Sequence, residues 1–235
     1  MKGNRLVLLL FLSLICIIYP ANAERIRYNF TKGAQYSYTY TRQYLSGVTA
    51  PIIAPRKSSD SKTIDFIIKT VGFQENAFIL DIGNANATFR RYISPNGVIK
   101  GAPAEDRDTI PFFLVFPDGD WKIGTTIKQN TEITAYGKKI PVVWNLTLNK
   151  VDSIKNLAVI TFVTQFGVND DRFFSRQINY SGKIIFNLSE GVIHQADWTS
   201  VYKAKQLCKE NAISRNLWSF EKQTNHSLKM TGVEK

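Results

Sequence analysis

Residues 142–149 read Val-Val-Trp-Asn-Leu-Thr-Leu-Asn, so apolar and polar side chains alternate from one residue to the next. Successive side chains of a β-strand point to opposite faces, and strict alternation therefore predicts a strand with one buried and one solvated face. Residues 35–41, Gln-Tyr-Ser-Tyr-Thr-Tyr-Thr, alternate in the same way and place three tyrosines on one face. These two stretches indicate a sheet with one apolar side.

Further alternating runs lie at 158–162 and 184–188, and turn-forming residues such as Ser181-Gly182 and Ser189-Glu190-Gly191 separate the runs. Runs of this kind predict roughly ten to twelve strands connected as a meander of hairpins. The predicted fold is all-β, a curved antiparallel sheet or half-barrel with little helix. Residues 203–216 have partly helical spacing but fit a strand or a bend equally well, and a final strand is expected from Leu217 to about Thr231.

The same order of motifs occurs twice along the chain. Each copy has a glycine before its first strand (Gly33 and Gly124), two further strands, and a glycine turn that ends in Gly-Val-Ile (Gly97 and Gly191). The further strands match as 64–71 with 144–151 and as 78–82 with 158–162. We therefore expect a single β domain, residues 24–235, built from related meander units at about 28–104 and 116–202, with a C-terminal strand segment at 203–235. Titratable residues do not correspond between the copies, which indicates that a sheet was duplicated and not a site.

Two segments interrupt the meander. Residues 45–60 contain Gly47, Pro51 and Pro55 around two isoleucines and predict a long loop with an apolar tip. Residues 111–117, Pro-Phe-Phe-Leu-Val-Phe-Pro, form a continuous apolar run between the two units. Such a run fits a buried connecting strand, and it also fits a loop that caps the inside of a sheet or contacts a lipophilic ligand.

The N-terminus has the features of an export signal. Lys2 and Arg5 precede an apolar run of 14 residues, 6–19, and Pro20-Ala21-Asn22-Ala23 follows as an A-x-A cleavage pattern. The run is shorter than the roughly 20 residues that cross a bilayer, so we predict a signal peptide, residues 1–23, and no transmembrane segment. The prediction is a periplasmic or extracellular protein, cleaved after Ala23. Lipidation at Cys16 is the less favoured alternative, because no small residue precedes this cysteine.

Charge and motif content argue against several function classes. The net charge of +11 allows contact with anionic surfaces, but the cations are scattered and predict no nucleic-acid partner. The two histidines, His194 and His226, stand outside any zinc-binding pattern, so no metal or cofactor is expected. No nucleophile lies beside a base in the sequence, which favours a non-enzymatic protein. An enzyme with dispersed residues, among them His194, Asp197 and Cys208, is a minor alternative.

Aromatic residues dominate the faces that we expect to point inward. Their ordinary role is core packing, and the alternative is a cavity on the concave side of the sheet that suits an acyl chain. The candidate lining residues are Tyr36, Tyr38, Tyr40, Phe66, Phe112, Phe113, Phe116, Trp144 and Phe162.

Residues 116–124, Phe-Pro-Asp-Gly-Asp-Trp-Lys-Ile-Gly, introduce the second unit, and residues 182–193 close it with Gly-Lys-Ile-Ile-Phe-Asn-Leu-Ser-Glu-Gly-Val-Ile. This order resembles a group of uncharacterised bacterial exported proteins, although Ile127 stands where a tryptophan is often found. The all-β layout is more distantly similar to periplasmic carriers of lipoproteins and lipids, whose open half-barrels hold acyl chains. The 36–40 strand also resembles the start of large animal lipid-transfer proteins.

Together these features predict an exported, non-enzymatic binding protein for a lipophilic small molecule or a cell-envelope component. The alternative is a structural or adhesive envelope module that contacts anionic surfaces. The identity of the ligand and the oligomeric state remain open at this point.

Overall fold

The computed structural model describes residues 23–50, 53–84, 87–100, 113–135, 138–170, 174–206 and 219–235. These ranges contain strands and irregular segments but no helix, so none of them provides a helix that could cross a membrane. The strands are β1 (Ala23–Glu24), β2 (Gln35–Ala50), β3 (Ile53–Gln74), β4 (Ala77–Gly83), β5 (Thr88–Ile93), β6 (Ile99–Lys100), β7 (Trp121–Lys122), β8 (Thr126–Ala135), β9 (Lys138–Asp152), β10 (Leu157–Asp170), β11 (Phe174–Asn187), β12 (Val192–Gln206) and β13 (Ser219–Glu234).

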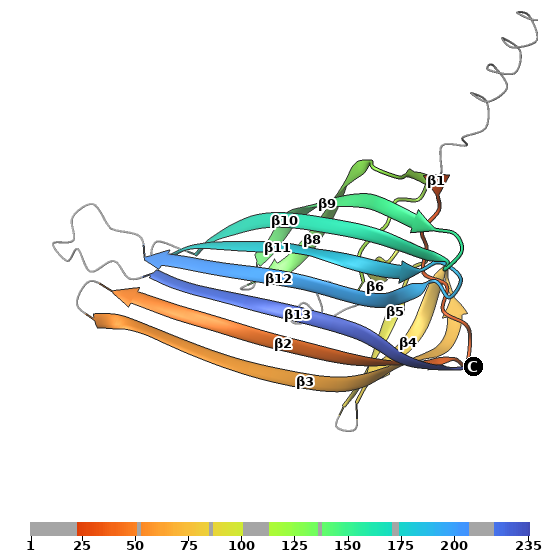
Figure 1. Cartoon of the computed structure of the whole chain (residues 1–235), viewed down its shortest axis with the longest axis horizontal. Helices are drawn as coiled ribbons and strands as arrows, with labels where there is room; N and C mark the ends of the chain where they lie inside the picture. The colour runs from red at the N-terminus through yellow and green to blue at the C-terminus, as the bar shows by residue number, and fades with distance from the viewer. Residues whose placement is uncertain are drawn as a thin grey trace, which may run out of the picture.

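Eleven of the strands form one antiparallel sheet in the order β6-β5-β4-β3-β2-β13-β12-β11-β10-β9-β8. The sheet is open, because β6 and β8 lie at opposite edges, and Figure 1 shows its long strands bowed. The remaining pair, β1 and β7, forms a small separate sheet in which Glu24 lies opposite Trp121. The prediction of an all-β, curved antiparallel sheet is confirmed.

The sheet consists of two five-stranded meanders joined by β13. Strands β2 to β6 are neighbours in chain order, as are β8 to β12, and β13 pairs with β12 on one side and with β2 on the other. From the β8 edge, the sheet therefore runs through β8 to β12, then β13, then β2 to β6, so both meanders are arranged in the order of the chain. The first meander lies within the predicted unit 28–104, and the second lies within 116–202 except for the last four residues of β12, 203–206. The duplication of the sequence itself stays a prediction.

Positive φ angles among the described glycines occur at two pairs of positions, Gly33 with Gly124 and Gly97 with Gly191. These are the pairs that the sequence comparison matched. A residue with a Cβ is strained at positive φ, so glycine is favoured at each of these turns.

Hydrogen bonds also correct the matching of the second strands. The N–H of Gly33 donates to the carbonyl of Thr70 at 2.9 Å, and the N–H of Gly124 donates to Leu148 at 2.7 Å. Thr70 therefore corresponds to Leu148, whereas matching residues 64–71 with 144–151 pairs it with Lys150. A shift of two residues leaves every side chain on the same face, so the alternation pattern alone could not detect it.

We call the face that carries Tyr36, Tyr38 and Tyr40 the inner face, and the opposite face, with Ser37 and Thr39, the outer face. Most apolar inner-face side chains of both meanders are buried, whereas the alternate positions of β2 are half-buried or exposed. The hydrophobic core therefore lies on one side of the sheet.

An N-terminal segment, residues 25–34, crosses the inner face at one end and completes the core there. The N–H of Tyr28 donates to Pro95 at 2.7 Å, and that of Asn29 donates to Gly191 at 2.9 Å, so the segment bridges the corresponding turns of the two meanders. The Tyr28 ring stacks on Phe30 at 5.9 Å between ring centroids. Both side chains are buried.

Residues 113–120 form an irregular segment beside this N-terminal stretch, and we call it the inner loop. The N–H of Phe116 donates to Asn96 at 2.7 Å, and Leu114 and Phe116 are buried in the core. For these residues the expectation of a connecting strand is wrong and the capping loop is the correct alternative. Pro111 and Phe112 lie outside the described residues.

Residues 45–50 and 53–60 form the ends of two paired strands, so for these residues the prediction of a loop is wrong. Pro51 and Ile52 lie outside the described residues. Leu45 lies opposite Ser59 and Val48 opposite Arg56 in the β2–β3 pair. On its other side β3 pairs with β4 only from residue 67 onward, so Pro55 lies on a stretch with a free edge. Proline is tolerated on edge strands and at bulges, and the β2–β3 ladder shifts register between Val48 and Ala50, opposite this stretch.

Only part of the C-terminal segment for which the sequence made predictions is described by the structure. The final strand, expected at 217–231, is β13 at Ser219–Glu234. Residues 203–206 of the helical candidate belong to β12. The rest of that candidate, Cys208 and residues 1–22 of the predicted signal peptide lie outside the described residues.

Candidate functional site

An apolar groove of about 310 Å³ lies on the inner face of the first meander. This volume is at the lower end of the range for small-molecule sites, roughly 300–1,000 Å³. The lining residues belong to strands β2 to β5, to the turn between β4 and β5, and to the inner loop. They are Tyr40, Arg42, Lys62, Ile64, Phe66, Ile68, Ile82, Gly83, Asn84, Ala87, Phe89 and Phe113.

Strand register builds the floor of the groove. Tyr40 lies opposite Ile64, and Ile68 lies opposite Ile82 on the next strand. Residues directly opposite on one face are in side-chain contact distance, so these pairs form a continuous apolar surface across β2, β3 and β4. Phe89 adds a ring that is 56% exposed, and Phe113 adds a half-buried ring from the inner loop.

The groove also has a positively charged end. Arg42 and Lys62 lie directly opposite each other, one step along β2 and β3 from the Tyr40–Ile64 pair on the same face. A neighbouring wall is formed by the turn between β4 and β5, where the N–H of Asn84 donates to the carbonyl of Ala87 at 2.9 Å. The site thus combines an apolar body with a polar, cationic end.

A hydrogen-bonded row supports Tyr40 from the two neighbouring strands. The Tyr40 hydroxyl lies 2.7 Å from Nδ1 of His226 on β13, and Nε2 of His226 lies 2.9 Å from the Ser200 hydroxyl on β12. Trp198 stacks on the imidazole at 4.7 Å between ring centroids. Because His226 is held by Ser200 and by Trp198, its hydrogen bond fixes the orientation of the Tyr40 ring. Ser200 and His226 also have the spacing of a nucleophile and its base, but neither lines the groove.

The groove ends at a solid core. Beyond Phe66 and Phe113, the space bordered by Tyr28, Tyr38 and Leu228 is only about 10 Å³. The Tyr38 hydroxyl donates to the Ile193 carbonyl at 2.9 Å. Burial raises the pKa of the Tyr28 and Tyr38 phenols, so both remain neutral across the physiological range.

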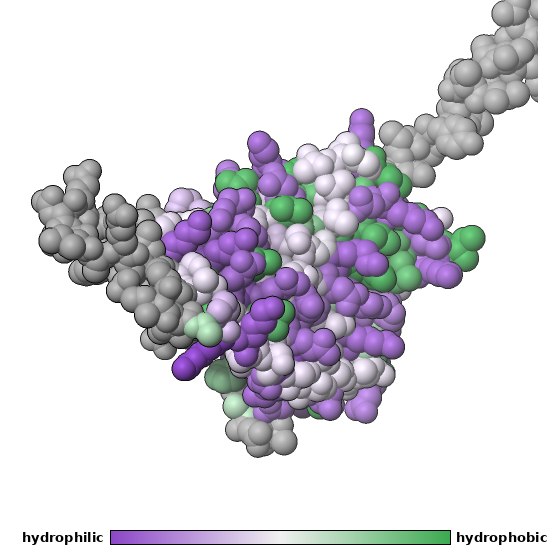
Figure 2. All heavy atoms as spheres, turned by 60° about the vertical axis from the view of Figure 1, so that its left-hand side comes forward, coloured by the Kyte–Doolittle hydropathy of each residue, from purple (hydrophilic) through white to green (hydrophobic). Residues whose placement is uncertain are grey.

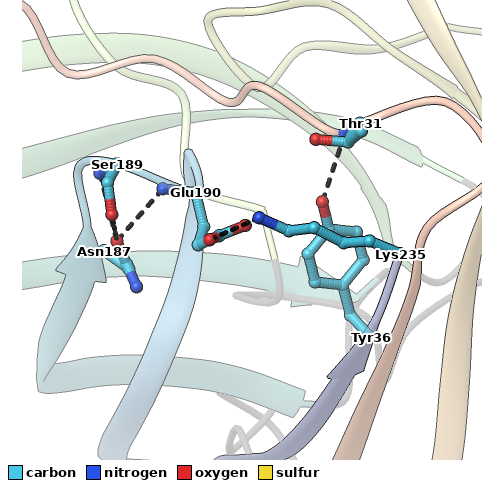
Figure 3. Close-up of polar contacts among 6 residues, drawn as sticks. All are labelled: Thr31, Tyr36, Asn187, Ser189, Glu190 and Lys235. Atoms are coloured by element: carbon cyan, nitrogen blue, oxygen red, sulfur yellow. Dashed lines mark hydrogen bonds and ion pairs between the residues drawn. The ribbon is translucent and has the colours of Figure 1, made fainter.

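Polar contacts near the end of the groove that the solid core closes hold the C-terminal residue and the N-terminal segment in place (Figure 3). The Lys235 ammonium lies 2.9 Å from Glu190 in the turn between β11 and β12, and this hydrogen bond raises the pKa of the lysine. The N–H of Thr31 donates to the Tyr36 hydroxyl at 3.1 Å, which ties the N-terminal segment to β2. In the same turn Asn187 Oδ1 accepts the N–H of Glu190 at 3.1 Å.

The structure separates the aromatic residues that the sequence singled out. Tyr40, Phe66 and Phe113 line the groove, and Tyr38 stacks behind it on Phe66 at 5.5 Å between ring centroids. The others for which burial is described lie in the core, at 0–6% exposure, and are Tyr36, Phe116, Trp144 and Phe162. For these four, core packing is the role that the structure supports. Phe112 is outside the described residues.

Sequence reasoning missed the aliphatic and cationic part of the groove. Ile64 and Lys62 continue the alternation of Phe66 towards the N-terminus, and Arg42 continues that of Tyr40 towards the C-terminus. Following each inner-face series beyond its last aromatic residue would have identified them.

The outer face offers a different kind of surface. Figure 2 shows a side of the molecule that is mainly hydrophilic, with small hydrophobic areas between. Hollows of about 680 and 920 Å³ are lined largely by outer-face side chains, among them Asp65, Lys183, Asp197 and Asn225. They have no aromatic cluster comparable to that of the groove. Within the described ranges, no three His, Cys, Asp or Glu residues lie close enough to hold a metal ion.

Comparisons with known proteins do not assign the chain to a family. No protein-family model matches it, and no curated protein matches it. A structure of lipovitellin, described as showing lipid–protein interactions, is similar with a TM-score of 0.40 and 12% sequence identity. The match covers 88% of this chain but only 26% of lipovitellin. A likeness this weak carries no argument about function, and the resemblance to bacterial exported proteins stays a prediction.

Proposed function

We propose that this protein is an exported, non-enzymatic binding protein that holds the apolar chain of an amphiphilic molecule in the groove of the first meander. The observation that carries the proposal is the apolar floor between β2 and β4, with Arg42 and Lys62 at one end. Apolar pockets with a few convergent polar groups are the usual form of small-molecule sites.

The state of the lining residues supports a ligand. Ile64, Phe66 and Ile82 are only partly buried, and Phe89 is mainly exposed, so apolar surface remains to be covered. Each methylene group that leaves water contributes about 0.8 kcal/mol. Eight buried methylenes would contribute about 6 kcal/mol before the entropy costs of association, which suits a ligand with one acyl chain.

The polar end favours a particular orientation of that ligand. Its head group would lie beside Arg42 and Lys62, and its chain would extend towards Phe66 and Phe113. The predicted signal peptide supports a cell-envelope or extracellular source for the molecule.

A variant that fills the groove tests the proposal. Ala87 is exposed and lines the groove, and the adjacent Thr88 lines the outer-face hollow. Ala87→Trp should abolish saturable binding of a fluorescent long-chain fatty acid, whereas Thr88→Trp should leave it unchanged. Absence of saturable binding by the wild-type chain would contradict the proposal, and so would equal binding by the two variants.

A further inference from the structure

Strand β8 forms a long, regular edge of the sheet. It has 10 residues and pairs with β9 along its whole length, from Thr126 opposite Thr147 to Ala135 opposite Lys138, without a register shift. Among the described strands, none pairs with its other side. At the opposite edge of the sheet, β6 comprises 2 residues within the part of the chain that the structure describes.

Edges of natural sheets are usually protected from pairing with another chain by proline, by a bulge, by short length or by charged side chains, especially lysine. Strand β8 has no proline or glycine, and its ladder with β9 contains no bulge. Its charged residues are Lys128 and Glu132, so another strand can pair with its free edge only in a register that matches these charges.

The sequence of β8 is complementary to itself in the antiparallel direction. Around Asn130 it reads Thr-Ile-Lys-Gln-Asn-Thr-Glu-Ile-Thr, residues 126–134. If two copies pair with Asn130 on the two-fold axis, Lys128 of each copy lies opposite Glu132 of the other. Opposite charges are a favourable cross-strand pair.

The charges also disfavour the registers whose axis lies two residues away on either side. A two-fold axis at Lys128 would place two lysines opposite each other, and an axis at Glu132 would place two glutamates there. Like charges directly opposite destabilise a strand pair. Lys128 and Glu132 are both exposed.

We propose that two copies of this protein associate through β8, antiparallel and centred on Asn130, into a dimer with one continuous sheet. A two-fold contact is self-complementary, as the palindrome requires. The pairing would add roughly eight to ten backbone hydrogen bonds. It places the inner faces of both copies on the same side of the joined sheet. This inference does not depend on the proposed function.

Exchanging the charges tests the dimer. Sedimentation equilibrium of the purified chain over a wide range of concentrations should show a monomer–dimer equilibrium. Lys128→Glu places glutamates opposite each other, Glu132→Lys places lysines opposite each other, and each variant alone should raise the dissociation constant about tenfold or more. Mixing the two variants restores both Lys–Glu pairs and should restore dimers, specifically heterodimers.

Thermal unfolding of each single variant controls for folding, because both substitutions lie at exposed positions. The proposal is overturned if the wild-type chain is monomeric at every concentration. It is also overturned if Lys128→Glu dimerises as well as wild type, or if the mixture of variants fails to associate.

Discussion

Gly182 on β11 occupies a position where the packing of two neighbouring strands leaves no room for a side chain. It lies opposite Trp198 on β12 and Phe162 on β10. A Cβ atom at this glycine would lie 2.4 Å from Cβ of Trp198 and 2.8 Å from the Phe162 ring. Contacts below 3.0 Å require displacement, and two of the atoms involved belong to well-packed aromatic residues. We expect Gly182→Ala to lower the free energy of unfolding by about 1–3 kcal/mol.

The matched control is Gly47→Ala on β2, because the nearest atom to an added Cβ there is the Arg56 carbonyl oxygen at 3.9 Å. For a domain of this size, 1 kcal/mol corresponds to a change in melting temperature of about 2–4 °C. Urea unfolding followed by tryptophan fluorescence should separate the two variants, with Gly47→Ala close to wild type or more stable. Equal stability of Gly182→Ala and the wild-type protein would refute the packing argument.

Two further predictions concern polar groups. Asp81 accepts hydrogen bonds from Arg90 at 2.7 and 2.9 Å, and these bonds lower the pKa of the Asp81 carboxyl. The pair therefore stabilises the fold fully above the ordinary pKa of 3.8. This stabilisation is lost as the pH falls through the lowered pKa of the folded state. NMR titration should show the Asp81 pKa rising towards its ordinary value in Arg90→Gln, and an unchanged pKa would contradict this. The second prediction concerns the row of hydrogen bonds at His226: His226→Phe keeps an aromatic ring beside Trp198 but removes the hydrogen bonds to Tyr40 and Ser200. Urea unfolding should show a loss of about 1–3 kcal/mol, and no loss would show that the row contributes nothing.

The alternation of side chains predicted the sheet and its apolar face correctly, because the two-residue period of a strand assigns faces without knowledge of its partners. The repeated order of motifs also identified glycine turns at Gly97 and Gly191, and both glycines have positive φ. Neither result required a tertiary contact.

Strand order and strand length were not accessible in the same way. The position of β13 between β2 and β12 depends on pairing between distant parts of the chain. Pro55 suggested a loop because proline is excluded from a central strand, but its stretch of β3 has a free edge. The inner loop at 113–120 is apolar because it packs in the core, and apolar content alone does not distinguish such a loop from a buried strand.

Because alternation assigns a face but not what covers that face, it also could not separate the aromatic residues of the core from those of the groove. Tyr36 and Tyr40 occupy the same face of β2, four residues apart, and the sequence gives no reason to treat them differently. In the structure the N-terminal segment covers the end that holds Tyr36, and Thr31 hydrogen-bonds its hydroxyl. Tyr40 lies beyond this segment and borders the groove. The N-terminal segment, which directly precedes β2 in the chain, thus decides which of these two rings is buried in the core and which borders the groove.

The most direct test of the central claim is native mass spectrometry of the protein purified from cells, followed by organic extraction. We predict that the wild-type chain carries a copurifying amphiphile with an acyl chain, and that Ala87→Trp, purified in the same way, does not. A wild-type protein that shows only its apo mass and yields no extractable amphiphile would contradict the account.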